Sequence, residues 1–229
     1  MIRVLTLLLL APVIAGAAPV PPESDRQKVA RLWGEPRVPS GSYRVKPEGD
    51  HLTLRTIGWP VAFDYRRPEF QVTREVAGDF DVRVKLYSLD PPARGIHYEG
   101  SPQTAAGLYI DGGDCTVALY RWMALHTDHG RLQEGMQDSP WLSRRTRNAG
   151  SGSMLGAWEA GKSGHLRVIR KGDQLTAMTS FDGANWKEHN AAMGGLKLPD
   201  AVTVGLFVGH TTSQQCSATF AEFTIEKPK

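Results

Sequence analysis

Residues 165–190, "HLRVIRKGDQLTAMTSFDGANWKEHN", contain two strand-like runs and two turn signals. In the first run Leu166 and Val168 alternate with Arg167 and Ile169, and a second alternating run follows the short connection "KGDQ". A period of two is typical of a strand that turns one face to a core, and a tight polar connection of this kind closes hairpins. The stretch therefore predicts an antiparallel pair of half-buried strands.

The second turn signal, "SFDGANW", raises a functional question. Ser180, Asp182, Gly183 and Trp186 nearly spell the Asp-box pattern S-x-D-x-G-x-x-W, but here Asp and Gly are adjacent. Asp-Gly between β-type runs is a strong hairpin signal, and an Asp side chain can accept bonds from nearby backbone N–H groups. We therefore expect a structural turn, with Trp186 folded back onto the strand, rather than a catalytic or Ca²⁺-binding loop.

Similar short runs continue along the chain from residue 42. About ten β-type runs are separated by turn residues, with no convincing helix between them. This organisation is typical of two packed sheets or a barrel.

Five blocks carry a family resemblance: "QVTREVAGDFDVRVKL", "AAGLYIDGGDCTVALYRW", the stretch quoted above, "VTVGLFVG" and "ATFAEFTI". In this order they resemble an uncharacterised bacterial family of concanavalin A-like β-sandwiches, sometimes labelled after an enolase-regulation protein. The resemblance covers about residues 57 to 226. It implies an all-β fold, a two-sheet antiparallel jelly roll of the laminin-G/glucanase type, often found in exported proteins. Because that family has no established activity, the resemblance informs the fold more than the function.

The N-terminus predicts export. Residues 1–17 combine Arg3, an apolar run and the small residues Ala15-Gly16-Ala17, the order of a secretory signal peptide cleaved near Ala17. No later run of about 18 apolar residues predicts a membrane span. We expect a periplasmic or extracellular protein.

Residues 18–41 form a Pro-rich lead-in to the predicted sandwich domain, residues 42–229. Within it, "SDRQKVARLWG" predicts one short helix, because Ser24 or Asp25 can cap its start and Gly34 can end it.

The charge balance argues against one class of partner. The chain has 27 Lys and Arg against 24 Asp and Glu, and loss of Arg3 with the signal leaves 26 − 24 = +2. A charge so near neutral lacks the dense cationic field that binds nucleic acid, so we expect no nucleic-acid partner.

Cys115 and Cys216 are the only cysteines. An oxidising compartment would permit a disulfide between them, and the alternative is two small buried thiols. Spacing does not decide between the two.

The spacing of the acidic residues argues against a glucanase-type active site. Glucanases of this fold place two carboxylates on an E-x-D-x-x-E strand, and no such string occurs here. Glu75, Asp79 and Asp81 come closest, but their spacing fits no acid/base pair. We therefore predict no catalytic residues.

Two further groups could bind metal. Asp111 and Asp114 flank a Gly pair that reads more naturally as a hairpin turn than as a Ca²⁺ loop. His126, Asp128 and His129 lie close together but fall short of a complete ligand set. We predict no metal and no cofactor.

Alternation also predicts an outer aromatic face. Tyr109 opposes core-directed Leu108, while Tyr120 and Trp122 oppose Leu119. With Arg167 beside them and Trp141 on a neighbouring loop, these rings form a candidate glycan-binding face. Alternatively, residues 126–164, predicted as one irregular strand flanked by long loops, cover that face.

Three hypotheses follow. The first is an exported, non-catalytic sandwich that binds carbohydrate or an envelope component; the second is a hydrolase or lyase for modified sugars on the same fold; the third is a purely structural envelope domain. An exposed aromatic groove favours binding, a convergent carboxylate pair favours the enzyme, and a covered face favours the structural role. The sequence identifies neither the ligand nor the oligomeric state.

Overall fold

A computed structural model describes residues 23–37, 43–56, 71–93, 101–128, 131–146, 149–159, 162–189, 196–212 and 214–229; for residues 43, 126–128 and 131–135 it describes the backbone alone. The predicted signal peptide lies outside these residues. Within them, no helix is long and apolar enough to cross a membrane.

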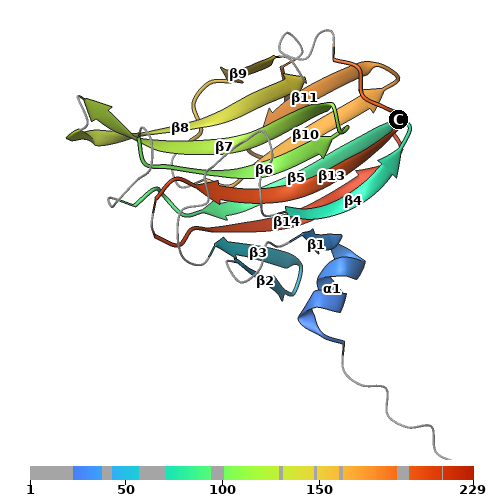
Figure 1. Cartoon of the computed structure of the whole chain (residues 1–229), viewed down its shortest axis with the longest axis horizontal. Coiled ribbons are helices and arrows are strands. Elements are labelled where there is room, and N and C mark those ends of the chain that lie inside the picture. The colour runs from blue at the N-terminus through green and yellow to red at the C-terminus, as the bar shows by residue number, and fades with distance from the viewer. Residues whose placement is uncertain are drawn as a thin grey trace, which may run out of the picture.

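The strands form two seven-stranded antiparallel sheets, sheet A and sheet B, which lie face to face in Figure 1. In spatial order, sheet A consists of β1 (Glu35–Arg37), β4 (Gln71–Ala77), β13 (Ala201–His210), β6 (Gln103–Asp111), β7 (Cys115–Asp128), β8 (Arg131–Thr146) and β9 (Gly150–Met154). Sheet B consists of β12 (Lys187–Glu188), β11 (Gln174–Ser180), β10 (Gly164–Lys171), β5 (Phe80–Leu89), β14 (Ser217–Glu226), β3 (His51–Thr56) and β2 (Tyr43–Glu48). The predicted two-sheet antiparallel sandwich is confirmed.

The core lies between the sheets and follows the alternation of the sequence. Sheet B contributes Leu166 and Val168 from β10, and sheet A contributes Val117 and Leu119 from β7. All four side chains are buried, and burial of such a side chain is worth about 1.5 to 3 kcal/mol. The predicted core faces of these strands are confirmed.

The N-terminal helix α1 (Asp25–Leu32) begins with a capping box. The Ser24 hydroxyl accepts from the Gln27 N–H at 3.3 Å, and the Gln27 side chain accepts from the Ser24 N–H at 3.0 Å. Gly34 follows the helix at φ +125°, where a Cβ would lie 2.5 Å from a backbone oxygen of β4. Val29 and Trp33 are buried in the main core. The lead-in therefore contributes to the same core as the sandwich.

A β-bulge in β14 fixes how the helix packs. The pairing of β14 with β5 shifts between Ala221 and Thr224, and Glu222 has φ 53°. One extra residue reverses the faces of the strand beyond it, so Phe223 turns inward as Phe220 does. Phe223 then stacks on Trp33 with ring centroids 6.1 Å apart and planes at 4°. The bulge thus joins the last strand to the N-terminal helix.

The expectation for residues 126–164 is wrong. In place of one irregular strand between long loops, β7 continues to Asp128, and β8 pairs with it on one side and with β9 on the other. Figure 1 shows this long hairpin extending beyond the rest of sheet A. Gly, Ser and Arg are weak strand signals, but neighbours on both sides supply the backbone hydrogen bonds that hold these residues extended.

The two cysteines are free. Cys115 lies at the end of the sandwich where β13 begins. The register shows this, because its neighbour Thr116 pairs with Asp111 on β6, and Asp111 pairs with Thr203 near the start of β13. Cys216 lies at the opposite end, where its backbone bonds Thr56. The ten residues of β13 separate the two levels by about 30 Å. A bridge is therefore excluded by geometry, and both thiols are buried, which raises the pKa of each.

His210 ends β13 and faces the core, fully buried. Neither ring nitrogen finds a hydrogen-bond partner of normal geometry in the described part of the chain. Burial lowers its pKa, an effect that the nearby Thr212 backbone only partly opposes. The folded protein therefore holds this imidazole neutral.

This burial predicts a pH-dependent stability. The unfolded chain keeps the ordinary imidazole pKa near 6.5 and binds the proton more readily. The free energy of unfolding should therefore fall as the pH drops below about 6.5, by up to about 1.4 kcal/mol per pH unit. Urea denaturation at about pH 7 and about pH 5.5 measures the loss, which His210→Leu should largely remove.

His189 is a second contributor, since burial also lowers its pKa. His189→Gln is therefore measured alongside. If His210→Leu leaves the pH dependence of the unfolding midpoint unchanged, the neutral buried histidine is not its source.

Candidate functional site

The predicted aromatic residues meet on the outer face of sheet A. Tyr109 lies on β6, Tyr120 and Trp122 on β7, and Trp141 on β8, where it pairs directly with Tyr120. Phe207 from β13 joins them. These five side chains form a cluster separate from the main core, which we call the aromatic face.

Ring contacts organise the aromatic face. Phe207 meets Tyr109 and Tyr120 edge-on, with centroids 6.4 and 5.6 Å apart. Trp122 and Trp141 form a tilted pair at 5.5 Å and 47°. Such offset and edge-on arrangements are the favoured ones for aromatic pairs.

Glycines let the rings lie close to the sheet. A Cβ at Gly107 would lie 2.6 Å from the Tyr120 Cβ, and a Cβ at Gly152 would lie 2.5 Å from the Trp141 indole nitrogen. A larger residue at Gly107 would therefore push against the backbone of β7, and one at Gly152 would displace the Trp141 ring.

The exposure of the rings differs from the expectation. Tyr109 is 0% and Tyr120 2% exposed, and Phe207 is also buried. Only Trp122 and Trp141 are half-buried, and the Trp122 N–H donates to the Gln103 side-chain oxygen at 3.0 Å. The prediction that Tyr109 and Tyr120 present exposed rings is therefore wrong, because alternation assigns a side chain to a face without telling whether the face is covered.

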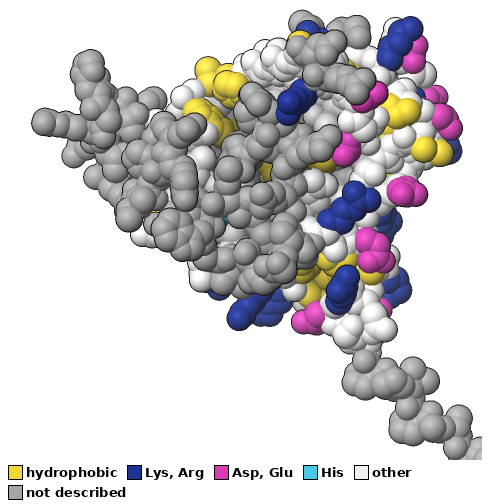
Figure 2. Space-filling view, in the orientation of Figure 1, with side chains coloured by type: hydrophobic (Ala, Val, Ile, Leu, Met, Phe, Trp, Pro, Cys, Tyr) yellow, Lys and Arg dark blue, Asp and Glu magenta, His cyan; other side chains and the backbone are white. Residues whose placement is uncertain are grey.

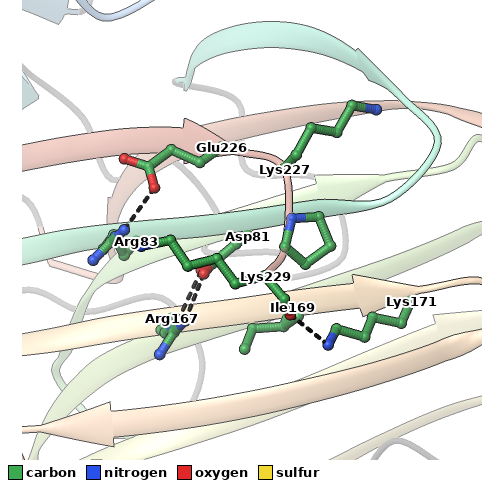
Figure 3. A pocket seen from close by; sticks show the side chains of 9 residues that line it. Asp81, Arg83, Arg167, Ile169, Lys171, Glu226, Lys227 and Lys229 are labelled. Atoms are coloured by element: carbon green, nitrogen blue, oxygen red, sulfur yellow. Dashed lines mark hydrogen bonds and ion pairs between the residues drawn. The ribbon is translucent and has the colours of Figure 1, made fainter.

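Arg167 is not beside these rings. It lies on β10 in sheet B and points to the outer face of that sheet, on the opposite side of the sandwich (Figure 3). Its guanidinium donates two hydrogen bonds to Asp81, at 2.8 and 2.5 Å, and lies 5.4 Å from the Trp186 ring centre. The prediction that Arg167 lies beside the aromatic rings is therefore wrong. The alternation within its hairpin tells that Arg167 faces away from the core, but it does not tell which of the two sheets the hairpin joins.

A pocket on the outer face of sheet B, drawn in Figure 3, is lined by two carboxylates that are held in ion pairs. It has a volume of about 170 Å³ and contains Asp81 and Glu226. Asp81 accepts from Arg167, and Glu226 accepts from Arg83 at 2.8 Å. Each carboxylate is thus held in an ion pair with an arginine of sheet B.

The other acidic candidates also have structural roles or lie apart. Asp79 accepts from the Gly172 N–H at 2.7 Å, while Glu75 is exposed on β4 of sheet A. Asp111 accepts from the Gly113 N–H at 2.7 Å in the turn that joins β6 and β7, so the predicted hairpin is confirmed there. Within the described residues no three His, Cys, Asp or Glu side chains could hold a metal ion. The side chains of His126, Asp128 and His129 lie outside the description.

The "SFDGANW" turn is confirmed as a hairpin connection between β11 and β12. The Asp182 carboxylate accepts from the backbone N–H groups of Ala184 and Asn185 and from the Asn185 amide. These bonds, those from Asn185 first, hold the pKa of the Asp182 carboxyl well below its usual range. Gly183 supplies the left-handed conformation at φ 75°.

Comparison with known proteins supports the fold. No family model matches the chain, and no curated protein matches it. A functionally unknown protein from Saccharomyces cerevisiae shares 17% identity at a TM-score of 0.58 over 84% of this chain and 95% of that one. The alginate lyase from Klebsiella pneumoniae shares 10% identity at 0.52, over 82% of this chain and 85% of its own.

A GH43 protein from Bacillus licheniformis shares 14% identity at a TM-score of 0.50. The match covers 83% of this chain but only 40% of that protein. At such identities the likeness shows the fold alone. It agrees with the predicted concanavalin A-like jelly roll.

Proposed function

We propose that this protein is an exported, non-catalytic β-sandwich that binds carbohydrate through the Trp122 and Trp141 pair. The observation that carries the proposal is this pair of half-buried indoles on an outer sheet face, 5.5 Å apart. An indole offers a flat apolar surface with a polar tip, which suits a sugar ring with its C–H faces and hydroxyl edges.

The buried rings support the pair from below. Trp122 and Trp141 pack against the buried cluster that contains Tyr109, Tyr120 and Phe207. A side chain held by neighbours loses little freedom on binding, so a supported platform binds more tightly than a mobile one. Tyr109 and Tyr120 thus act as positioning residues and not as ligand contacts.

Three further considerations support a glycan ligand without catalysis. Two proteins of the same fold are named for carbohydrate chemistry, an alginate lyase and a GH43 protein, and this is analogy at the level of the fold. The carboxylates of the pocket on sheet B are ion-paired. The sequence patterns given above are the basis for inferring export, a glycan or envelope partner and membership of the concanavalin A-like family.

Binding measurements test the proposal. Trp122→Ala and Trp141→Ala should each weaken binding to β-glucan or peptidoglycan fragments by about tenfold or more, as expected for a central aromatic contact. Isothermal titration calorimetry measures affinity, and a thermal melt confirms that each variant is folded.

Tyr87→Ala is a matched control, since Tyr87 is 55% exposed on the outer face of sheet B. It should leave binding unchanged. Undetectable binding by the unmutated protein would favour the structural envelope role. If both tryptophan variants bound glycan as tightly as the unmutated protein does, the glycan would bind elsewhere than at this pair.

A further inference from the structure

A second pocket lies at the open edge of the sandwich, where the last strands of the two sheets, β9 and β12, lie. It has a volume of about 250 Å³, and we call it the edge pocket. Its lining residues are Pro140, Leu155, Gly156, Ala157, Trp158, Thr179, Ser180, Phe181, Asn185 and Lys187. None of them belongs to the aromatic face.

Two aromatic rings form the apolar side of the edge pocket. Phe181 is 42% exposed and meets Trp158 edge-on at 5.6 Å. Trp158 is fixed, because its indole N–H donates to the Lys162 carbonyl at 2.9 Å and a Cβ at Gly164 would lie 2.3 Å from its ring. The pocket thus presents one accessible ring on a rigid support.

The segment that carries Trp158 is held equally firmly. The Leu155 N–H donates to the Pro140 carbonyl and the Trp158 N–H to the Asp138 carbonyl, both at 2.9 Å. Residues 155–158 therefore continue to hydrogen-bond with β8 after β9 ends. The walls are pre-formed, as binding sites for small molecules usually are.

Asn185 supplies a fixed polar group. One end of its amide donates to the Asp182 carboxylate at 2.7 Å. This bond orients the side chain and leaves its carbonyl oxygen available to accept from a ligand hydroxyl. The Asp182 turn thus also positions a lining residue of the pocket.

Lys187 supplies a positive charge. It is exposed, and its ammonium group lies 3.8 Å from the position of a Cβ on Gly156, across the pocket. In the described part of the chain no carboxylate lies within ion-pair distance of it, and no acidic residue lines the pocket. A cation beside an aromatic wall and a polar amide is complementary to a ring that carries one carboxylate and hydroxyl groups.

From this geometry we propose that the edge pocket binds a hexuronic acid unit. Its volume is below the usual range of about 300 to 1,000 Å³ for drug-sized ligands, so it suits a single sugar ring. Phe181 stacks on the ring, Lys187 pairs with the carboxylate and Asn185 accepts from a hydroxyl. The site is separate from the Trp122 and Trp141 platform and does not depend on it.

Nuclear magnetic resonance titration tests this assignment, with the Asn185 side-chain amide as local reporter. The probes are methyl β-glucuronide, methyl β-glucoside, which lacks the carboxylate, and benzoate, which lacks the hydroxyls. The glucuronide should shift the Asn185 signal and bind at least about tenfold more tightly than the glucoside, because a charge-assisted hydrogen bond is about twice as strong as a neutral one. Added salt should weaken the binding of the two charged probes, glucuronide and benzoate, and leave that of the glucoside unchanged.

Variants separate the contributions. Lys187→Met should reduce glucuronide affinity about tenfold, to near that of the glucoside, and Phe181→Ala should weaken both glycosides. Lys197→Met is the matched control, because Lys197 is exposed and does not line the pocket. Thermal melts should show that all three variants are folded.

Three outcomes would overturn the proposal: equal affinity for glucuronide and glucoside, unchanged affinity in Lys187→Met, or benzoate binding as tightly as glucuronide. The double variant Trp122→Ala/Trp141→Ala distinguishes the two sites. It should bind methyl β-glucuronide normally even where binding to β-glucan is lost.

Discussion

Replacing Asp138 with alanine should lower the free energy of unfolding by about 3 to 5 kcal/mol, because it leaves the charge of Arg121 buried without a partner. The two side chains are only 7% and 6% exposed. The Arg121 guanidinium donates to one Asp138 oxygen at 2.8 Å and pairs with the other. Among the described residues, Arg121 also lies over the face of Trp158 at 5.2 Å and donates to the Lys162 carbonyl at 3.4 Å, contacts that cannot replace a carboxylate.

Urea denaturation measures this loss, and two controls locate its cause. The double variant Arg121→Met/Asp138→Leu removes both charges and should recover much of the stability, because an apolar pair of similar size avoids the cost of burying charge. Glu23→Ala breaks the exposed ion pair with Arg31 and should change stability little. A small effect of Asp138→Ala would mean that water reaches Arg121.

Tyr109→Ala should also lower the free energy of unfolding by about 3 to 5 kcal/mol. Tyr109 is completely buried, so its removal leaves a cavity next to Phe207, against which it packs. The surrounding sheet relaxes only partly around such a cavity, which adds to the lost burial of the ring.

Chemical denaturation of Tyr109→Ala and Tyr87→Ala makes the comparison. Because Tyr87 is exposed, Tyr87→Ala should lower the free energy of unfolding far less than Tyr109→Ala does. If Tyr109→Ala were as stable as the unmutated protein but bound less glycan, Tyr109 would be a ligand contact and its position beneath the platform would be wrong.

Local patterns in the sequence predict local features of this fold well. Alternation gives the core faces of β7 and β10, and Asp182-Gly183 gives the hairpin, because each depends only on neighbours along the chain. Alternation could also have placed Phe207 on the outer face, since it follows the core residue Leu206 in "VTVGLFVG".

Features that depend on distant pairing could not be predicted in this way. Which sheet holds Arg167 is set by the pairing of β10 with β5, residues about eighty positions apart. The edge pocket joins Trp158 to Phe181 and Lys187, and no motif in the sequence connects the loop after β9 with the turn after β11. The burial of Tyr109 likewise depends on tertiary packing. The alternation of residues along a strand tells which face a side chain lies on, but not whether that face is covered.

The place of β14 has a consequence for how the chain folds during synthesis. β14 is the last strand in the sequence, yet it lies inside sheet B between β5 and β3, and Phe223 on it supports Trp33 next to the N-terminal helix. Until β14 has left the ribosome, β3 and β5 therefore expose unpaired edges, and Phe223 is not available to pack against Trp33. Such edges invite aggregation, and pairings between distant segments form slowly. The sandwich thus stays incompletely folded until β14 has been synthesised, and during that time its open edges are of the kind that chaperones protect.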